Sequence, residues 1–154
     1  MTNKENCSHT NVTRIIPTLA IKGADKAIEH YKKAFGAVET YPPMMCPVRH
    51  TVAHASLKIG ESEIFLGEEC PEMGANAIPG QAFYIYVPDA DAAIKKAVQA
   101  GLKQDKPAED MFWGDRMGTV TDPYGIKWTL ATHVRDVSPQ EMQEAMKKMA
   151  SKAA

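Results

Sequence analysis

The chain has 154 residues, of which 44% are hydrophobic and 24% charged, as expected of a one-domain soluble globular protein. Its 18 Lys and Arg residues against 19 Asp and Glu residues give a formal net charge of -1 at pH 7, which argues against nucleic acid or an anionic membrane as a partner. No apolar stretch approaches the roughly 20 residues of a membrane span, so a membrane protein is excluded.

Residues 1–13 are polar and lack apolar periodicity, so we expect a flexible arm there and no signal peptide. The three cysteines, Cys7, Cys46 and Cys70, are odd in number and irregularly spaced. We interpret them as reduced thiols and predict a cytoplasmic location.

The first half of the chain predicts one helix among four strands. Apolar residues at helical spacing predict a helix over residues 24–35, and Gly36 stands where a C-terminal cap belongs. Pro17 indicates an edge strand or a local break in pairing. Alternating or short apolar patterns predict the strands, over residues 14–21, 38–41, 51–59 and 62–66.

The second half follows the same order after a candidate linker over residues 68–80. A helix opens at Asp89 and closes at Gly101. Ser138 and Glu141 form a capping-box pattern that predicts a third helix over residues 137–154. Its apolar stripe consists of Met142, Ala145, Met146 and Met149. The predicted strands of this half lie over residues 82–87, 118–121 and 126–132.

The two halves resemble each other. Residues 24–28 (ADKAI) recur as residues 90–94 (ADAAI), and residues 63–67 (EIFLG) have their counterpart in residues 127–131 (KWTLA). This repeat predicts an α+β fold of two βαβββ modules, residues 14–67 and 81–133, in one domain over residues 14–136. One module cannot cover both faces of its sheet, so two modules must pair, within the chain or across a homodimer.

Strand alternation divides the sheet residues between two faces. The helices are expected to cover the face that carries Ile15, Leu19, Ile64, Leu66, Ile85 and Leu130. The opposite, open face is expected to carry Thr18, His54, Ser56, Phe65, Tyr84, Tyr86 and Thr129, with His133 as a further candidate.

Two segments carry a family resemblance: residues 23–36 (GADKAIEHYKKAFG) and residues 113–133 (WGDRMGTVTDPYGIKWTLATH). With them the chain resembles the glyoxalase/bleomycin-resistance/extradiol-dioxygenase superfamily, also called vicinal oxygen chelate proteins, and is most similar to its PhnB-like branch. The resemblance covers about residues 14–142. It implies paired βαβββ modules that form a cupped mixed sheet, and frequent homodimers.

The resemblance also implies where a metal would bind. Metal-using members hold a divalent cation through a His or Gln on the first strand, a Glu on the module's last strand, and a His and a Glu at the matching positions of the second module. Carried over by motif, these positions are Ile16, Phe65, Ala82 and Thr129. The first three cannot bind a hard cation and one hydroxyl cannot hold it, so we expect no metal site. No glycine-rich loop for a nucleoside cofactor is present, so we expect no cofactor.

The open face and the turn before the penultimate strand supply the candidate ligand-binding residues. His54 is the candidate catalytic base, or else a structural histidine bonded to a neighbouring strand. Arg116 could clamp a carboxylate, or brace its turn together with Asp115. Tyr84 and Tyr86 could line a cavity or simply pack. The full candidate set is Thr18, His54, Phe65, Tyr84, Tyr86, Trp113, Asp115, Arg116 and Thr129.

Three functions remain open. The first is a cytoplasmic homodimer whose metal-free cup binds a small organic molecule. The second is an enzyme of the same fold, of lyase, isomerase or dioxygenase type, that uses His54 as a base or a relocated metal site with His54 or His133. The third is an interaction module with a vestigial cup, in which the methionine-bearing tail recruits a partner.

Overall fold

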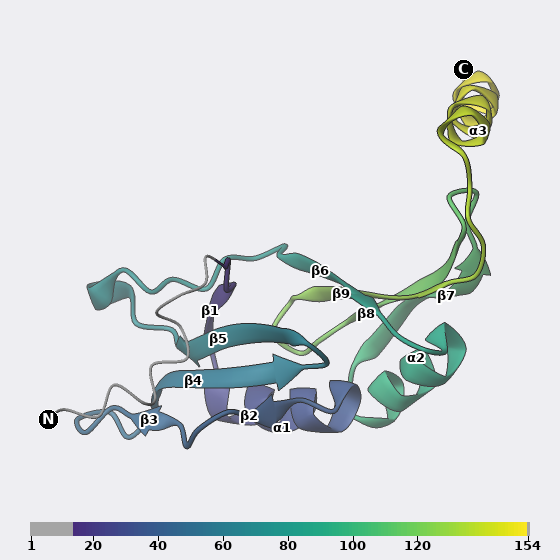
Figure 1. Ribbon diagram of the computed structural model, residues 1–154. Coiled ribbons are helices and arrows are strands. Elements are labelled where there is room, and N and C mark those ends of the chain that lie inside the picture. Colours follow the sequence, from purple (N-terminus) through teal and green to yellow (C-terminus); the bar gives the residue numbers. More distant parts are fainter. Residues whose placement is uncertain (1–13, 154) are drawn as a thin grey trace, which may run out of the picture.

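Two βαβββ modules follow one another in the chain (Figure 1). The computed structural model describes residues 14–153. The arm predicted over residues 1–13, which includes Cys7, lies outside the described residues.

The first module forms a mixed sheet in the order β1-β5-β4-β2, with β3 paired to β4. β1 runs parallel to β5, and the remaining pairs are antiparallel. The elements are β1 (Thr18–Ile21), α1 (Ala24–Phe35), β2 (Val38–Glu39), β3 (Met44–Met45), β4 (Val52–Ile59) and β5 (Ser62–Glu68).

The second module repeats this topology in the order β6-β9-β8-β7, with β6 parallel to β9. A short 3-10 helix, Pro71–Met73, lies between the modules. The register is also repeated: Thr18 pairs with Phe65 in the first module as Tyr84 pairs with Thr129 in the second. The elements are β6 (Ala82–Tyr86), α2 (Ala90–Gln99), β7 (Lys103–Asp110), β8 (Asp115–Thr121) and β9 (Lys127–His133).

The α+β fold and the duplicated module are therefore confirmed, with one refinement: the strands form two mixed sheets, one per module, rather than a single continuous sheet. Each sheet ends at the first strand of its own module, because β1 pairs only with β5 and β6 only with β9.

Helix α1 forms where the sequence predicts it. Its buried residues recur every three or four positions, and Gly36 ends it with the left-handed backbone (φ 66°) that glycine adopts without strain. Its N-terminus is capped from another element: the Glu68 carboxylate accepts hydrogen bonds from the main-chain N–H groups of Gly23 and Ala24, both at 2.9 Å. The capping charge also complements the helix dipole.

An aromatic cluster joins the two modules. The Trp128 ring of β9 lies 5.2 Å from Tyr31 and 4.7 Å from Phe35, both on α1, and 5.0 Å from Phe83 on β6. Tyr31 and Trp128 are buried. Trp128 therefore belongs to the core, and its partners show that α1 packs on the second module as well as on its own sheet.

A buried carboxylate reinforces this junction. Asp122 accepts hydrogen bonds from the Tyr31 hydroxyl (2.7 Å) and the Trp128 indole N–H (3.0 Å). It also accepts from the main-chain N–H groups of Tyr124 and Ile126, both at 2.9 Å. The turn over residues 122–125, which joins β8 to β9, is therefore a structural link between the modules.

Several strand predictions differ from the structure, two of them for clear physical reasons. The first strand begins at Thr18 rather than Arg14, since Pro17 has no N–H to pair, and Ile15 is 95% exposed instead of covered by a helix. β7 was not predicted at all: its sequence, KQDKPAED, is polar and almost fully exposed because it is an edge strand. An edge strand of this kind has no apolar alternation to detect.

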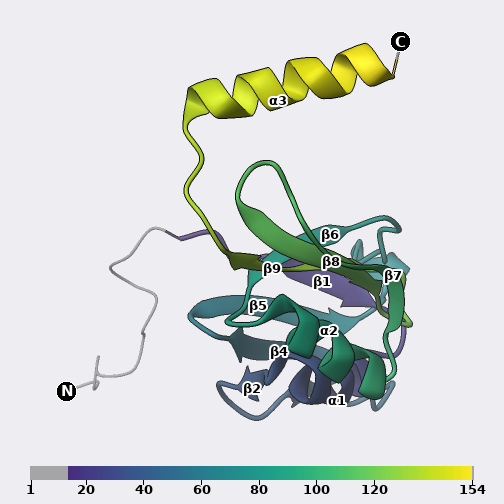
Figure 2. The ribbon, with the colours of Figure 1, turned by 90° about the vertical axis from the view of Figure 1, so that its right-hand side faces the viewer.

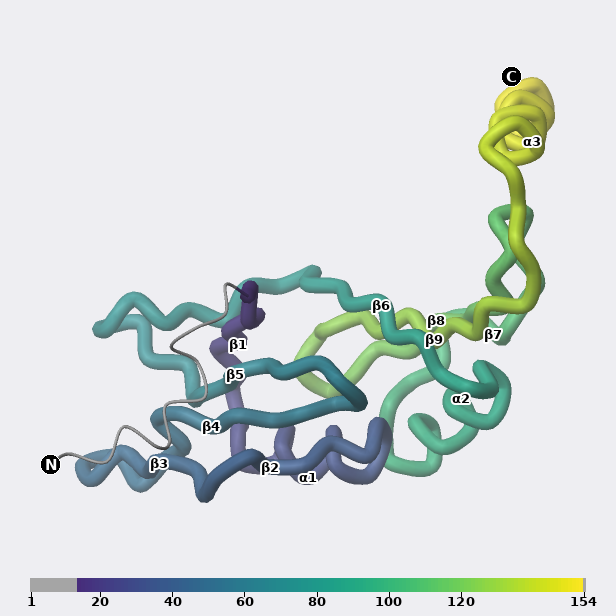
Figure 3. Tube along the Cα trace, viewed as in Figure 1, coloured from purple at the N-terminus to yellow at the C-terminus, as the bar shows by residue number. Residues whose placement is uncertain are grey.

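The C-terminal helix α3 (Pro139–Lys152) is confirmed with its capping box at Ser138 and Glu141. It lies apart from both sheets, beyond the connector that follows β9 (Figures 2 and 3). None of the helices within residues 14–153 has the length and apolar character that crossing a membrane requires.

Candidate functional site

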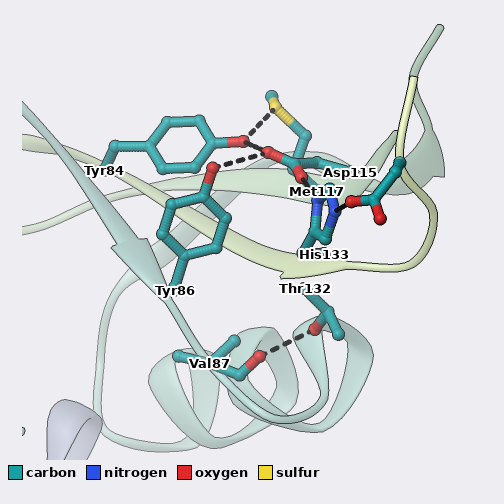
Figure 4. Close-up of polar contacts among 8 residues, drawn as sticks. Tyr84, Tyr86, Val87, Asp115, Met117, Thr132 and His133 are labelled. Atoms are coloured by element: carbon teal, nitrogen blue, oxygen red, sulfur yellow. Dashed lines mark hydrogen bonds and ion pairs between the residues drawn. The ribbon is translucent and has the colours of Figure 1, made fainter. Parts of the chain in front are cut away.

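A buried carboxylate lies at the centre of a polar group on the open face of the second sheet (Figure 4). Asp115, at the start of β8, is only 3% exposed. Its Oδ2 accepts hydrogen bonds from the hydroxyls of Tyr84 (2.6 Å) and Tyr86 (3.0 Å). Its Oδ1 lies 2.9 Å from Nδ1 of His133, whose Nε2 lies 2.7 Å from Asp136. We call these five residues the Asp115 cluster.

The sheet register explains how residues from three strands meet. Tyr84 and Tyr86 are two apart on β6 and so share a face. Asp115 pairs with His133 across β8 and β9. Between Tyr86 and β8 lies Ala131 of β9, whose small side chain leaves room for a tyrosine ring to extend across the strand.

The contacts within the cluster shift the pKa values of Asp115, Tyr84, Tyr86 and His133. Burial acts to raise the pKa of Asp115, but hydrogen bonds from Tyr84, His133 and Tyr86 outweigh it and lower the value. Burial and the bond to Asp115 raise the pKa of Tyr84 to about 12, against an opposing effect of Trp113. The pKa of Tyr86 is raised as well, chiefly by its bond to Asp115. At neutral pH the centre is thus a carboxylate surrounded by protonated phenols.

His133 is the titratable member near neutral pH. Hydrogen bonds to Asp136 and then Asp115 raise its pKa. Both partners are carboxylates, so both bonds are satisfied together only when the imidazole carries its second proton. The Asp136 side chain is fully exposed, whereas the buried Asp115 fixes the orientation of the ring.

Some predicted site residues do come together here. Tyr84, Tyr86 and Asp115 belong to the cluster, and Thr129 lies on the same face of β9 beside Tyr84. Trp113 lies in the turn before β8, where its ring packs edge-on against Phe112 at 4.9 Å.

Arg116 does not belong to this group. It lies in β8 rather than in a turn, and as the neighbour of Asp115 it points to the opposite face. There its guanidinium binds Asp91 of α2 (2.7 and 3.0 Å) and Asp110 of β7 (3.2 Å). The expected brace with Asp115 is not formed, because strand alternation separates the two side chains.

The predicted residues of the first sheet form a separate group. Nε2 of His54 lies 2.6 Å from the Tyr41 hydroxyl, and its ring packs edge-on against Phe65 at 4.8 Å. Thr18 pairs with Phe65 and is exposed. His54 thus has a structural partner, although Tyr41 lies in the loop after β2 rather than in a neighbouring strand.

Sequence reasoning gave less weight to His133 and missed Asp136. Period-two alternation from Thr129 leads directly to His133, so its face was predictable. The association with Asp115 was not, because the penultimate strand was expected to begin at Gly118, three residues too late. Asp136 lies in an irregular connector, where no periodicity applies.

The cluster is an open surface rather than a closed pocket. Two clefts, of about 230 and 410 Å³, lie on the helix side, one along α1 and the other between α2 and β7. Neither includes a member of the Asp115 cluster. Within residues 14–153, no three His, Cys, Asp or Glu side chains are placed to hold a metal ion together.

The amino-acid sequence is similar to a known superfamily and to proteins of other organisms. The family model of the Glyoxalase/Bleomycin resistance protein/Dioxygenase superfamily matches residues 9–130. An uncharacterized protein of Mycobacterium bovis is 35% identical over 138 residues, with 84% of this chain and 90% of the relative covered.

Solved structures show the same fold. The X-ray structure of a gene product from Arabidopsis thaliana is 27% identical with a TM-score of 0.61, and the match covers 79% of this chain and 98% of that chain. A glyoxalase-related enzyme from Fulvimarina pelagi is 18% identical with a TM-score of 0.62, over 79% of this chain and 88% of that chain. At that identity the likeness concerns the fold alone.

Proposed function

The chain belongs to the Glyoxalase/Bleomycin resistance protein/Dioxygenase superfamily, and from this premise we propose that it binds a small organic molecule without a metal ion. The polar anchor of the proposed site is the Asp115 cluster. On its motif over residues 113–133 we assign the chain to the PhnB-like branch, and its free thiols at Cys46 and Cys70 support a cytoplasmic location.

The observation that carries this proposal is the combination of a buried charge with exposed aromatic rings. Tyr84 is 45% and Tyr86 65% exposed, although both hydroxyls are held by a carboxylate that is itself buried. Their rings lie 5.3 Å apart and are tilted by 56°. Fixed rings of this kind offer flat apolar contact at low entropic cost, beside the polar His133 and Asp136. The matching ligand has an aromatic or conjugated ring and a polar end.

The metal site of the family does not fit these residues. The register places Phe65 and Thr129 at equivalent positions of the two modules, and Ala82 precedes Tyr84 by two residues on the same face. Of these side chains and Ile16, only Thr129 carries an oxygen atom. Four oxygen or nitrogen donors are the usual minimum for a divalent cation, so we derive no step through a metal.

A second copy of the chain completes the proposed site. The Asp115 cluster faces solvent, whereas small-molecule sites in proteins are concave and bury most of the ligand surface. We therefore propose a homodimer in which a module of the partner subunit covers this face.

The proposal is tested by binding measurements on protein prepared with a chelator. A thermal-shift screen with aromatic amines, phenols and aromatic carboxylic acids identifies ligands without a prior guess, since binding raises the melting temperature. For a compound that binds, Tyr84→Phe should weaken affinity about tenfold, because it removes the hydrogen bond by which the Asp115 carboxylate holds the ring in place. Tyr124→Phe is the matched control: it removes a hydroxyl on the helix side and should leave affinity unchanged. Binding that needs an added divalent cation, or that ignores Tyr84→Phe, contradicts the proposal.

One observation favours a second candidate, an enzyme of the same fold. His133 is oriented by buried Asp115 through Nδ1, and its Nε2 contacts the fully exposed carboxylate of Asp136, which a substrate could displace. This arrangement suits a general acid or base, in place of His54. If a bound compound is converted, His133→Gln should abolish conversion, followed by NMR, while binding persists. Equal conversion by the variant excludes this role.

A further inference from the structure

Helix α3 presents an apolar stripe that its own domain does not cover. Met146 and Met149 are 56% and 57% exposed, and with Met142 and Ala145 they lie on one face of the helix. No residue of α3 is buried, and the helix lies apart from both sheets (Figure 2). The side-chain hydrogen bonds of Glu141 and Ser151 stay within the helix and its N-cap.

The position of α3 is set by its connector. The main-chain N–H groups of Val134 and Arg135 both donate to the Gly114 carbonyl, at 2.9 and 3.1 Å. Gly114 is required for this close approach, since a Cβ atom there would lie 2.1 Å from the Arg135 carbonyl oxygen. The bond from His133 to Asp136 fixes the same segment to the sheet. The connector is thus fixed to the second sheet immediately before α3, and α3 projects away from that sheet.

A helix of this length needs a partner. Isolated helices shorter than about 12–15 residues are marginal in water, and α3 has 14. Its capping box determines where the helix begins but gives the apolar stripe nothing to pack against. A partner must therefore cover the stripe.

The charges on α3 point to a second α3 as that partner. Its acidic residues, Glu141 and Glu144, lie in the N-terminal half, and its lysines in the C-terminal half. Glu141 and Lys148 are seven residues apart and flank the stripe on one side, whereas Gln143 and Ala150 flank it on the other. In an antiparallel pair, the flank with Glu141 and Lys148 faces the same flank of the second helix. The acidic half of one helix then meets the basic half of the other. A parallel pair would place this flank against the uncharged one.

We propose that α3 packs antiparallel against α3 of a second copy of this chain. Two helices of about 21 Å bury less than the ~1,200 Å² typical of a stable interface, so this contact adds to the homodimer proposed above and rests on it. The matching region of the family model ends at residue 130, so α3 lies outside that region.

Cysteine cross-linking tests the stripe. In a chain with Cys7, Cys46 and Cys70 replaced by Ser, Met146→Cys places a thiol in the stripe and Lys147→Cys places one on the opposite face. Under mild oxidation at low protein concentration, Met146→Cys should form disulfide-linked dimers about tenfold faster, because pairing raises the effective concentration of its thiol. Equal rates overturn the proposal. So does a Met146→Cys chain that resists both cross-linking and alkylation, since the stripe is then covered by something else.

Orientation is tested by mixing chains that carry Met142→Cys with chains that carry Met149→Cys. Antiparallel helices bring residue 142 near residue 149 of the second copy, so peptide mapping should find the mixed disulfide well above the half that random pairing gives. A majority of like-with-like disulfides overturns the antiparallel arrangement. Sedimentation of the unmodified chain separates the two proposals. If this chain is a dimer but the Met146→Cys variant does not cross-link faster than Lys147→Cys, only the α3 pair is overturned. If it is a monomer, both proposals are overturned.

Discussion

Replacing Asp122 with Ala removes the carboxylate that joins the two modules. Its Oδ2 accepts from the Tyr31 hydroxyl of α1 and the Trp128 indole of β9, and its Oδ1 accepts from two main-chain N–H groups of the turn. Tyr31 and Trp128 are buried, so water cannot take the place of the lost acceptor without opening the junction. The substitution therefore leaves two buried donors unsatisfied.

The magnitude follows from these contacts. Each of the two unsatisfied buried donors costs about 1–3 kcal/mol, and each of the two lost turn bonds about 1 kcal/mol, so the free energy of unfolding should fall by about 4–8 kcal/mol. Against a total of about 5–15 kcal/mol for a domain, this loss leaves the chain near its unfolding threshold. Tyr31→Phe is the matched comparison, because it removes one hydrogen bond together with its donor. It should cost only about 1–2 kcal/mol.

Urea denaturation followed by tryptophan fluorescence measures both variants, because Trp128 lies at the junction. A loss for Asp122→Ala no larger than that for Tyr31→Phe would refute the reasoning, since it would mean that the buried donors find other acceptors. A normal free energy of unfolding combined with altered fluorescence would show that the modules separate without unfolding.

Three further substitutions test other parts of the fold. Glu68→Gln weakens the cap at the N-terminus of α1 and should lower the free energy of unfolding by about 1 kcal/mol in urea denaturation. Gly118→Ala places a methyl group 2.7 Å from the Lys106 carbonyl oxygen and should cost about 1–3 kcal/mol by the same assay, whereas a neutral result would show that β7 moves freely. The raised pKa of His133 means that its protonated form stabilises the native state. This contribution is complete at pH values below the unfolded-state pKa of about 6.5, and it is lost as pH rises through the raised native-state pKa. The stability difference between wild type and His133→Gln should therefore shrink from acid to alkaline pH, and a constant difference would contradict the bond to Asp136.

The elements that the sequence predicted best are those with a buried stripe. In α1 and α2 the apolar spacing and the caps agree with each other, because burial against a sheet requires both. β7 escaped prediction because an edge strand is specified by its neighbour β8 and not by its own side chains. The first strand was extended too far because Ile15 continues the alternation beyond the point where Pro17 ends the pairing.

For the site, alternation predicted which face a residue occupies but not which residues on that face meet. Tyr84 and Tyr86 were placed correctly on the open face. Asp115, which accepts hydrogen bonds from both hydroxyls, was instead predicted to lie in a turn together with Arg116. The pairing of Asp115 with His133 depends on the register between β8 and β9. Register is set by the turn over residues 122–125 and by packing across the whole sheet, which a single sequence does not reveal.

The segment over residues 113–133 has two roles, divided between the faces of its strands. Asp122 and Trp128 lie toward α1 and hold the modules together, whereas Asp115 and His133 lie on the open face beside two exposed tyrosines. The segment that carries the family resemblance thus holds structural residues on one face and the candidate site on the other. The fold can persist while the open face changes, because neighbouring residues of a strand have separate environments. Membership of the superfamily therefore predicts the scaffold of this protein, and the ligand must be inferred from the open face itself.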